Sequence, residues 1–133
     1  MSIIDLYDLF IHNPQITTDS RNCPKGSIFF ALKGDKFDGN QYAGKALASG
    51  CVYAVIDNPD YYIGERTILV DNVLKTLQQL AHHHRKVLGL PIIGITGTNG
   101  KTTTKELLAA VLSTKFKLLY TEGNFNNHIG VPL

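Results

Sequence analysis

The chain is long enough for one modest domain, and its composition excludes several classes of protein. Its 133 residues are 44% hydrophobic and 18% charged, which is typical of a globular chain and not of a disordered one. The formal net charge is only +2, and the scattered Lys and Arg residues form no basic stripe for nucleic acid. No apolar run approaches the ~20 residues of a membrane span, and the start lacks a signal-peptide pattern. We therefore expect a cytoplasmic protein with no nucleic-acid partner and no membrane insertion.

The first elements predict a small α/β domain. Residues 2–11 have an apolar helical face, and Ser2 with Asp5 can form a capping pair at its start. Residues 16–18 and 27–32 predict strands, and the second is continuously apolar, as in a strand buried on both faces. A glycine-rich loop over residues 33–40 follows.

Two more helices and two more strands continue this pattern. Residues 40–49 predict a helix that ends at a glycine. Residues 52–56 and 67–70 predict strands. A long helix is expected over residues 72–88, with Asp71 as its cap and a broad apolar stripe. We expect these elements to form a small mixed sheet with helices.

A second domain is predicted after the long helix. Residues 91–96 predict a buried strand, a helix follows to about residue 114, and residues 116–120 predict another strand. This order opens a Rossmann-like nucleotide-binding domain. The predicted architecture is therefore an N-terminal mixed-sheet domain over residues 1–88 and the incomplete start of a central nucleotide-binding domain over residues 89–133.

Cysteine and histidine residues give no metal site in this interpretation. Cys23 and Cys51 are the only cysteines, and we expect free buried thiols in a reducing compartment, with a disulfide as the alternative. His82, His83 and His84 are consecutive on a predicted helix, so their side chains point in different directions and cannot converge on one ion. We expect His84 to lie on the apolar stripe.

The turn between the strand at 91–96 and the next helix has the pattern of a phosphate-binding loop. Gly97 and Gly100 let the backbone approach a phosphate, and N–H groups at the helix start can hold its oxygens. Lys101 can reach the β- and γ-phosphates of a nucleotide, and the Thr102 hydroxyl can bind Mg²⁺. The predicted nucleotide-binding residues are Gly97, Thr98, Asn99, Gly100, Lys101, Thr102 and Thr103.

Only the second half of the general P-loop pattern is present. That pattern has a glycine at the position of Ile95, and Gly94 lies one place too early. A glycine-rich turn with a chance lysine is the alternative, but strand, glycines, Lys-Thr and helix occur in the order that phosphate binding requires. A small P-loop kinase or GTPase would need the complete pattern and a later strand ending in Asp, and the sequence has neither.

This shorter loop, residues 97–103, resembles the ATP-binding signature of the Mur ligases and of folylpolyglutamate synthase. The resemblance extends over essentially the whole chain. Residues 18–21 resemble an Asp-Ser-Arg turn in the first domain of members that take a UDP-sugar peptide. Residues 29–34 and 37–39 resemble the strand and loop that follow it. Residues 123–133 resemble a segment of the member that adds a dipeptide.

The resemblance implies an ATP-dependent, amide-bond-forming ligase of peptidoglycan precursor synthesis. ATP would phosphorylate the terminal carboxylate of UDP-N-acetylmuramoyl-tripeptide, and the amine of D-alanyl-D-alanine would attack the acyl phosphate. Lys101 would be the catalytic cation at the γ-phosphate and Thr102 the ligand of Mg²⁺. We expect a monomeric parent enzyme. The open alternatives are the sister ligase that adds the third peptide residue and a non-catalytic UDP-sugar-binding module.

The resemblance also implies a substrate site. Ser20 and Arg21 would donate to the uridine or diphosphate group, and their alternative is a plain turn. A helix cap at Asp38 or Asn40 explains the next loop equally well. The remaining predicted substrate contacts are Phe37, Asp38, Gly39, Asn124, Asn126, Asn127 and His128.

We expect the chain to be inactive by itself. Glu106 and Glu122 are the only carboxylates after Lys101, and neither is placed to complete a magnesium site with Thr102. A nucleotide-binding sheet also needs several more strands than could follow here. The sequence therefore predicts an N-terminal fragment of a ligase.

Overall fold

The computed structural model describes residues 1–95, 97, 100–121, 129 and 132–133. It divides the chain into two compact units, Met1–Val87 and Leu88–Leu133. No helix among these described residues is long and apolar enough to cross a membrane.

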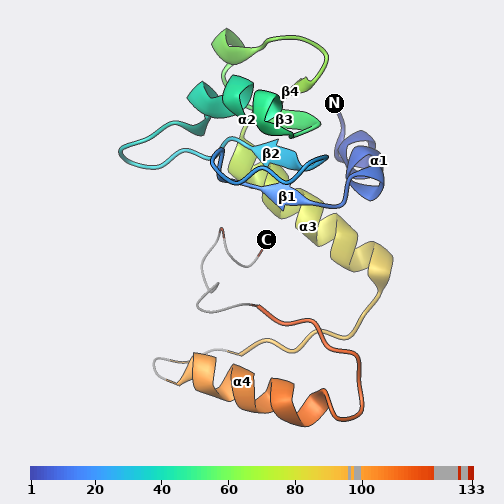
Figure 1. The fold of residues 1–133 in the computed structure, drawn as a ribbon. Coiled ribbons are helices and arrows are strands. Elements are labelled where there is room, and N and C mark those ends of the chain that lie inside the picture. Colours follow the sequence, from blue (N-terminus) through green and yellow to red (C-terminus); the bar gives the residue numbers. More distant parts are fainter. Residues whose placement is uncertain (96, 98–99, 122–128, 130–131) are drawn as a thin grey trace. The chain divides into compact units, whose positions relative to one another are not determined.

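The first unit is built around a four-stranded sheet whose strands lie in sequence order (Figure 1). All three neighbouring pairs are parallel, with Ile28 beside Ile16 and Tyr53, and Ala54 beside Thr67. The α/β class is confirmed, but the expected mixed sheet is wrong. Each connection is a long crossover and not a short hairpin, so each strand starts again from the same edge. The strands are β1 (Ile16–Thr17), β2 (Ile28–Phe30), β3 (Tyr53–Ile56) and β4 (Thr67–Leu69).

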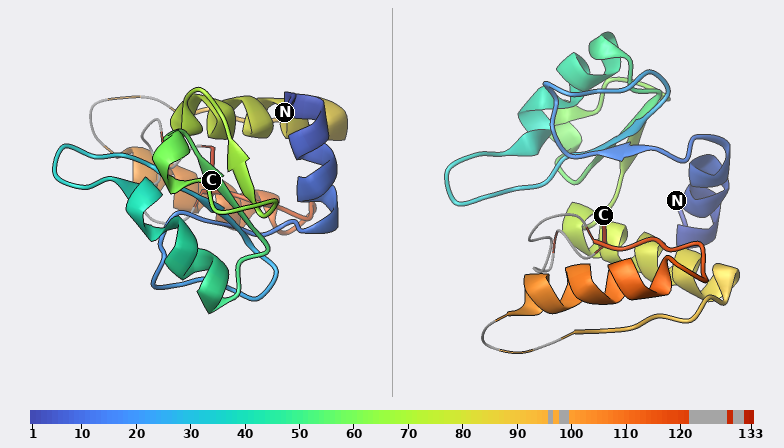
Figure 2. Two further views of the ribbon diagram at one scale, coloured as in Figure 1. Left: turned by 90° about the horizontal axis from the view of Figure 1, so that it is seen from above. Right: turned by 60° about the horizontal axis from the view of Figure 1, so that its bottom comes forward.

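Helices cover both faces of this sheet (Figure 2). On one face lies α2 (Ala43–Ser49), where small side chains allow close packing; this buried cluster comprises Phe29, Ala31, Ala43, Ala46, Leu47, Cys51, Ala54 and Ile56. On the other lie α1 (Ile3–His12) and α3 (Val73–Leu88). The alternate strand residues Ile28, Phe30 and Val55 are fully buried toward that second face, because side chains alternate along a strand. The sheet is thus buried on both sides, as the apolar character of β2 predicts.

The helix ends follow the capping rules, with one correction. The predicted capping box is present in α1: Ser2 Oγ accepts the Asp5 N–H at 3.2 Å, and Asp5 Oδ2 accepts the Ser2 N–H at 3.2 Å. Asp71 is not the cap of α3. That helix begins at Val73, so the cap position is Asn72, whose Oδ1 accepts the Lys75 N–H at 2.9 Å.

Short 3₁₀ helices complete the connections in the first unit. The helix expected over residues 40–49 is η1 (Gly39–Tyr42) continued by α2, and η2 (Pro59–Tyr61) lies between β3 and β4. Both begin with an Asp or Asn side chain that accepts a backbone N–H.

Ring contacts join α1 to α3. Tyr7 Oη lies 3.0 Å from His84 Nδ1, and the His83 ring stands edge-on to Tyr7 with 4.6 Å between centroids. His82 instead lies beside Arg85, with 3.5 Å between Nδ1 and Nη2. The three histidines therefore diverge as predicted, and two of them pack between helices.

Both cysteines are free thiols. Cys51 is fully buried, but Cys23 is half-buried, so the expectation that both are buried is wrong for Cys23. Burial and the neighbouring Cys51 thiol raise the pKa of Cys23 to about 11.

The second unit contains one regular element among its described residues, α4 (Lys101–Leu112). The predicted strands over residues 91–96 and 116–120 are absent from the described positions of both segments. A strand needs a neighbour for its backbone groups, and no described residue pairs with these segments. Their apolar side chains remain exposed, including Ile92, Ile93 and Leu119.

Candidate functional site

The carboxyl edge of the sheet is the first candidate site. Because the strands are parallel, the residues that follow them leave from the same edge, where ligands of open α/β sheets bind. Asp19 to Arg21 follow β1, Lys33 follows β2, and Asp57 follows β3.

The turn after β1 holds an exposed arginine. Arg21 Nε and Nη2 each lie 2.9 Å from an Asp19 carboxylate oxygen, which uses two of the five guanidinium donors. These bonds lower the pKa of Asp19 to about 2. The turn is closed by Thr17, whose hydroxyl donates to the Asn22 carbonyl at 2.7 Å. Arg21 and the partly exposed Ser20 are accessible, which an anion-binding role requires.

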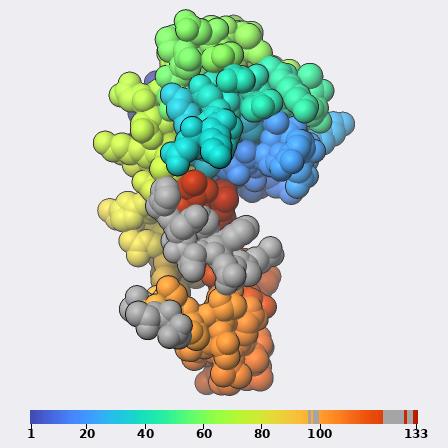
Figure 3. Space-filling model, turned by 90° about the vertical axis from the view of Figure 1, so that its left-hand side faces the viewer, coloured from blue at the N-terminus to red at the C-terminus, as the bar shows by residue number. Residues whose placement is uncertain are grey.

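The next segment, residues 33–38, forms a hairpin that projects from the sheet edge in Figure 1 and faces the viewer in Figure 3. Lys33 and Asp38 make an antiparallel bridge, and the Gly34 N–H donates to the Phe37 carbonyl at 2.9 Å. The Phe37 ring lies against Gly34, where a Cβ would collide with it. Phe37 is nevertheless 58% exposed, so one face of an aromatic ring is available for a ligand.

Two of the predicted substrate residues also have clear structural roles. Asp38 caps η1, accepting the Asn40 N–H at 3.0 Å, as the capping alternative predicts. Gly39 is buried against Ala31 and Leu32, which follow β2: its N–H donates to the Leu32 carbonyl at 2.8 Å, and a Cβ there would lie 2.5 Å from that oxygen. A substrate contact by either residue stays a prediction.

A partly buried polar network behind this hairpin was missed by the sequence reasoning. It consists of Lys33, Asp38, Asn40 and Asp57, and we call it the Asp57 network. Asp57 Oδ1 lies 3.1 Å from Lys33 Nζ and accepts the Asn40 Nδ2–H at 3.0 Å. Asp57 Oδ2 accepts the Val73 N–H at 3.1 Å, at the start of α3. The available signal was an Asp directly after a buried strand.

The start of α4 is the second candidate site. Gly100 has φ +75°, a left-handed conformation that glycine adopts without strain, and a Cβ there would meet nothing within 4 Å. No described side chain caps this helix, and the first N–H groups of a helix have no partner within it. Lys101 is half-buried, and Gly97, Thr102 and Thr103 are exposed. These residues fit an anion such as a nucleotide phosphate; the predicted Thr98 and Asn99 lie outside the described residues.

The donors for a magnesium ion are few in the described part of the chain. Thr102 contributes one hydroxyl, and Glu106 pairs with Lys105 at 3.6 Å. No group of three or more His, Cys, Asp or Glu gathers there. Mg²⁺ takes most of its ligands from water and phosphate, so Thr102 fits as a single protein ligand.

Four predicted substrate residues lie outside the described residues: Asn124, Asn126, Asn127 and His128.

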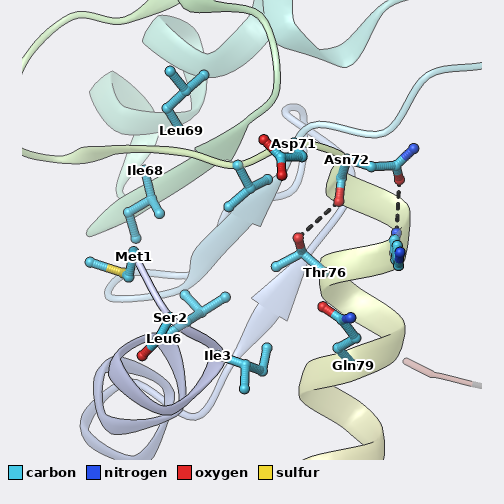
Figure 4. Close-up of a pocket in the computed structure, with 12 residues that line it drawn as sticks. Met1, Ser2, Ile3, Leu6, Ile68, Leu69, Asp71, Asn72, Thr76 and Gln79 are labelled. Atoms are coloured by element: carbon cyan, nitrogen blue, oxygen red, sulfur yellow. Dashed lines mark hydrogen bonds between the residues drawn. The ribbon is translucent and has the colours of Figure 1, made fainter.

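A cleft of about 320 Å³ lies elsewhere, between the start of α1, the end of β4 and the start of α3 (Figure 4). Asn72, Thr76 and Gln79 face it from α3, and Thr76 Oγ1 donates to the Asn72 carbonyl at 2.8 Å. None of the predicted site residues lines this cleft.

Comparison with known proteins identifies the family. Residues 12–85 match the model described as "Mur ligase family, catalytic domain", and residues 95–133 match "Mur ligase middle domain". The first match covers more than half of the chain, so the chain belongs to the Mur ligase family.

Individual relatives are similar over nearly the whole chain. The chain is 43% identical over 120 residues to the UDP-N-acetylmuramoyl-tripeptide–D-alanyl-D-alanine ligase of Bacillus subtilis, covering 89% of this chain and 26% of that protein. It is 44% identical over 127 residues to the enzyme of the same name from Synechocystis, covering 94% of this chain and 28% of that one. The chain thus spans about a quarter of the length of these relatives.

Solved structures agree with this similarity. The crystal structure of the MurF ligase from Thermotoga maritima in complex with ADP matches with a TM-score of 0.82 at 32% identity, covering 94% of this chain and 29% of that one. MurF from Acinetobacter baumannii matches with a TM-score of 0.81 at 38% identity, covering 90% and 26%.

Proposed function

We propose that this chain is the N-terminal part of an ATP-dependent ligase that adds D-alanyl-D-alanine to UDP-N-acetylmuramoyl-tripeptide in peptidoglycan precursor synthesis. The observation that carries the proposal is the similarity to relatives of that name across both units. The start of α4, where Gly100 at φ +75° is followed by Lys101 and Thr102, supports it with a phosphate-binding geometry. The proposed enzyme is a cytoplasmic monomer.

In this proposal α4 and the loop before it bind ATP. The backbone N–H groups of residues 98–103 and the helix dipole hold the phosphates, with Gly97 and Gly100 allowing their approach. Lys101 stabilises the negative charge that develops at the γ-phosphate during transfer to the substrate carboxylate. Thr102 would hold Mg²⁺, which would supply positive charge against the phosphates when bound.

The first unit binds the UDP end of the other substrate. Arg21 offers guanidinium donors and Ser20 a hydroxyl to the diphosphate. Phe37 offers its exposed ring to the planar base, in the hairpin that Asp38 and Gly39 close. Asn124, Asn126, Asn127 and His128 are proposed to contact the tripeptide.

Replacement of Lys101 tests the nucleotide site. In the full-length ligase, Lys101→Ala is expected to lower kcat/KM for ligation by about 100-fold, because a charge partner of the transition state is lost. The assay measures phosphate release with UDP-tripeptide and D-alanyl-D-alanine, and turnover of a UDP-dipeptide with a single amino acid would instead indicate the sister ligase. Lys115→Ala, at an exposed lysine beyond α4, is the matched control. Near-normal activity of Lys101→Ala would remove this residue from its role.

A further inference from the structure

We propose that Asp57 is a positioning residue for the UDP end of the substrate, because it fixes the hairpin of residues 33–38 to the core of the first unit. This inference rests on the proposed function, in which that hairpin contacts the substrate. Asp57 itself lies behind the hairpin and would not touch the ligand.

Asp57 connects to both ends of the hairpin. At the first end, Lys33 Nζ lies 3.1 Å from its carboxylate. At the other end, Asn40 donates from Nδ2 to Asp57 Oδ1 at 3.0 Å and to Asp38 Oδ1 at 2.7 Å. The side-chain oxygen Oδ1 of Asn40 in turn accepts the backbone N–H of Asp57 at 3.0 Å. The residue directly after β3 thus contacts the first end of the hairpin through Lys33 and the second end, Asp38, by way of Asn40.

Asp57 also connects this hairpin to α3. Its second carboxylate oxygen accepts the Val73 N–H, an otherwise unpaired donor of the first helical turn. Negative charge at this point is stabilised by the helix dipole. The hairpin, β3 and α3 are therefore held by one carboxylate.

The centre of the network, Asn40 and Asp57, is largely shielded from solvent, which makes its geometry well defined. The Asn40 residue is fully buried and the Asp57 side chain is only 10% exposed. Buried polar groups cost free energy when they lose a partner, so alternative hairpin positions that break these bonds are disfavoured. Burial raises the pKa of Asp57, but the bonds from Asn40, Val73 and Lys33 outweigh it and hold the pKa below its usual value.

The hairpin presents groups that suit a nucleoside diphosphate. Phe37 is exposed, and the Lys33 side chain is 50% exposed while it contacts Asp57. The turn with Arg21 leaves the neighbouring strand β1 at the same sheet edge. An aromatic face and two cations can bind a base and a diphosphate only if their spacing is maintained.

Asp57→Asn in the full-length ligase tests the inference. The asparagine oxygen can still accept the Val73 N–H, but the charge that holds Lys33 and one acceptor for Asn40 are lost. We expect KM for UDP-tripeptide to rise about tenfold, with kcat and KM for ATP within about twofold of wild type. Lys33→Gln should raise the same KM about threefold. The double variant should raise KM by less than the product of the two single effects, because each single variant already loses the shared Lys33–Asp57 interaction.

Two controls separate positioning from loss of stability. Val73→Ala removes a buried side chain beside the network but leaves every polar bond in place, so it lowers the unfolding temperature without raising KM for UDP-tripeptide. Lys36→Gln changes an exposed lysine of the hairpin and should leave all constants unchanged.

An unchanged KM in Asp57→Asn would overturn the inference. An equal KM rise in Val73→Ala at matched unfolding temperature would overturn it as well. Failure of the proposed function gives a different result, because the wild-type enzyme would then not turn over UDP-tripeptide with D-alanyl-D-alanine.

Discussion

At the scale of single residues, the structure separates glycines that are required from glycines that are not. Gly39→Ala is expected to destabilise the first unit by about 1–3 kcal/mol, because the new Cβ would overlap the Leu32 backbone and that strand cannot move within a packed core. Denaturant unfolding followed by circular dichroism measures the change.

Gly44→Ala is the matched control within the next helix. A Cβ there meets only Ile63 Cδ1, at an ordinary 3.5 Å. Alanine in a helix is better than glycine by about 0.5–1 kcal/mol, so this variant should be neutral or slightly stabilising. Equal losses of stability in both variants would contradict the close approach described for Gly39.

At the scale of elements, local signals were predictable from sequence and long-range pairings were not. The Ser2–Asp5 capping box and the burial of β2 follow from neighbouring residues alone. The parallel sheet depends on how crossovers return, and the Asp57 network joins residues 33–40 to a residue that is distant from them in the sequence. The predicted strand over residues 91–96 shows the same limit, because an apolar run becomes a strand only beside a partner.

The Asp57 carboxylate makes the connection between the hairpin of residues 33–38, β3 and α3 sensitive to acid. The pKa of Asp57 is lowered in the folded chain, so its contribution to stability is present above the ordinary value of 3.8 and is lost as pH falls below it through the folded pKa. Below about pH 4 the free energy of unfolding of the first unit should therefore decrease.

Urea unfolding at pH 6 and at pH 3 measures this difference for wild type and for Asp57→Asn. The variant cannot titrate at this position, so its stability should change less between the two pH values. An equal change in both proteins would assign the acid sensitivity to other carboxylates, such as Asp19.

At the scale of the whole molecule, we expect the 133-residue chain to hydrolyse no ATP above background, with or without UDP-tripeptide. In our proposal the start of α4 holds phosphates, but in the described part of the chain no three His, Cys, Asp or Glu residues come together as a metal site. Release of phosphate, measured beside the full-length ligase as positive control, checks this. Turnover by the short chain that disappears in Lys101→Ala would show that these residues suffice.

The sequence order of the strands has a consequence for synthesis on the ribosome. Neighbouring strands in the sheet are also consecutive along the chain. Each strand can therefore pair with a strand that has already been synthesised. The last strand of the sheet ends at Leu69, and Tyr7 can make its ring contacts once His84 has left the ribosome. We expect this unit to acquire its structure cotranslationally, before the nucleotide-binding residues that follow it have left the exit tunnel.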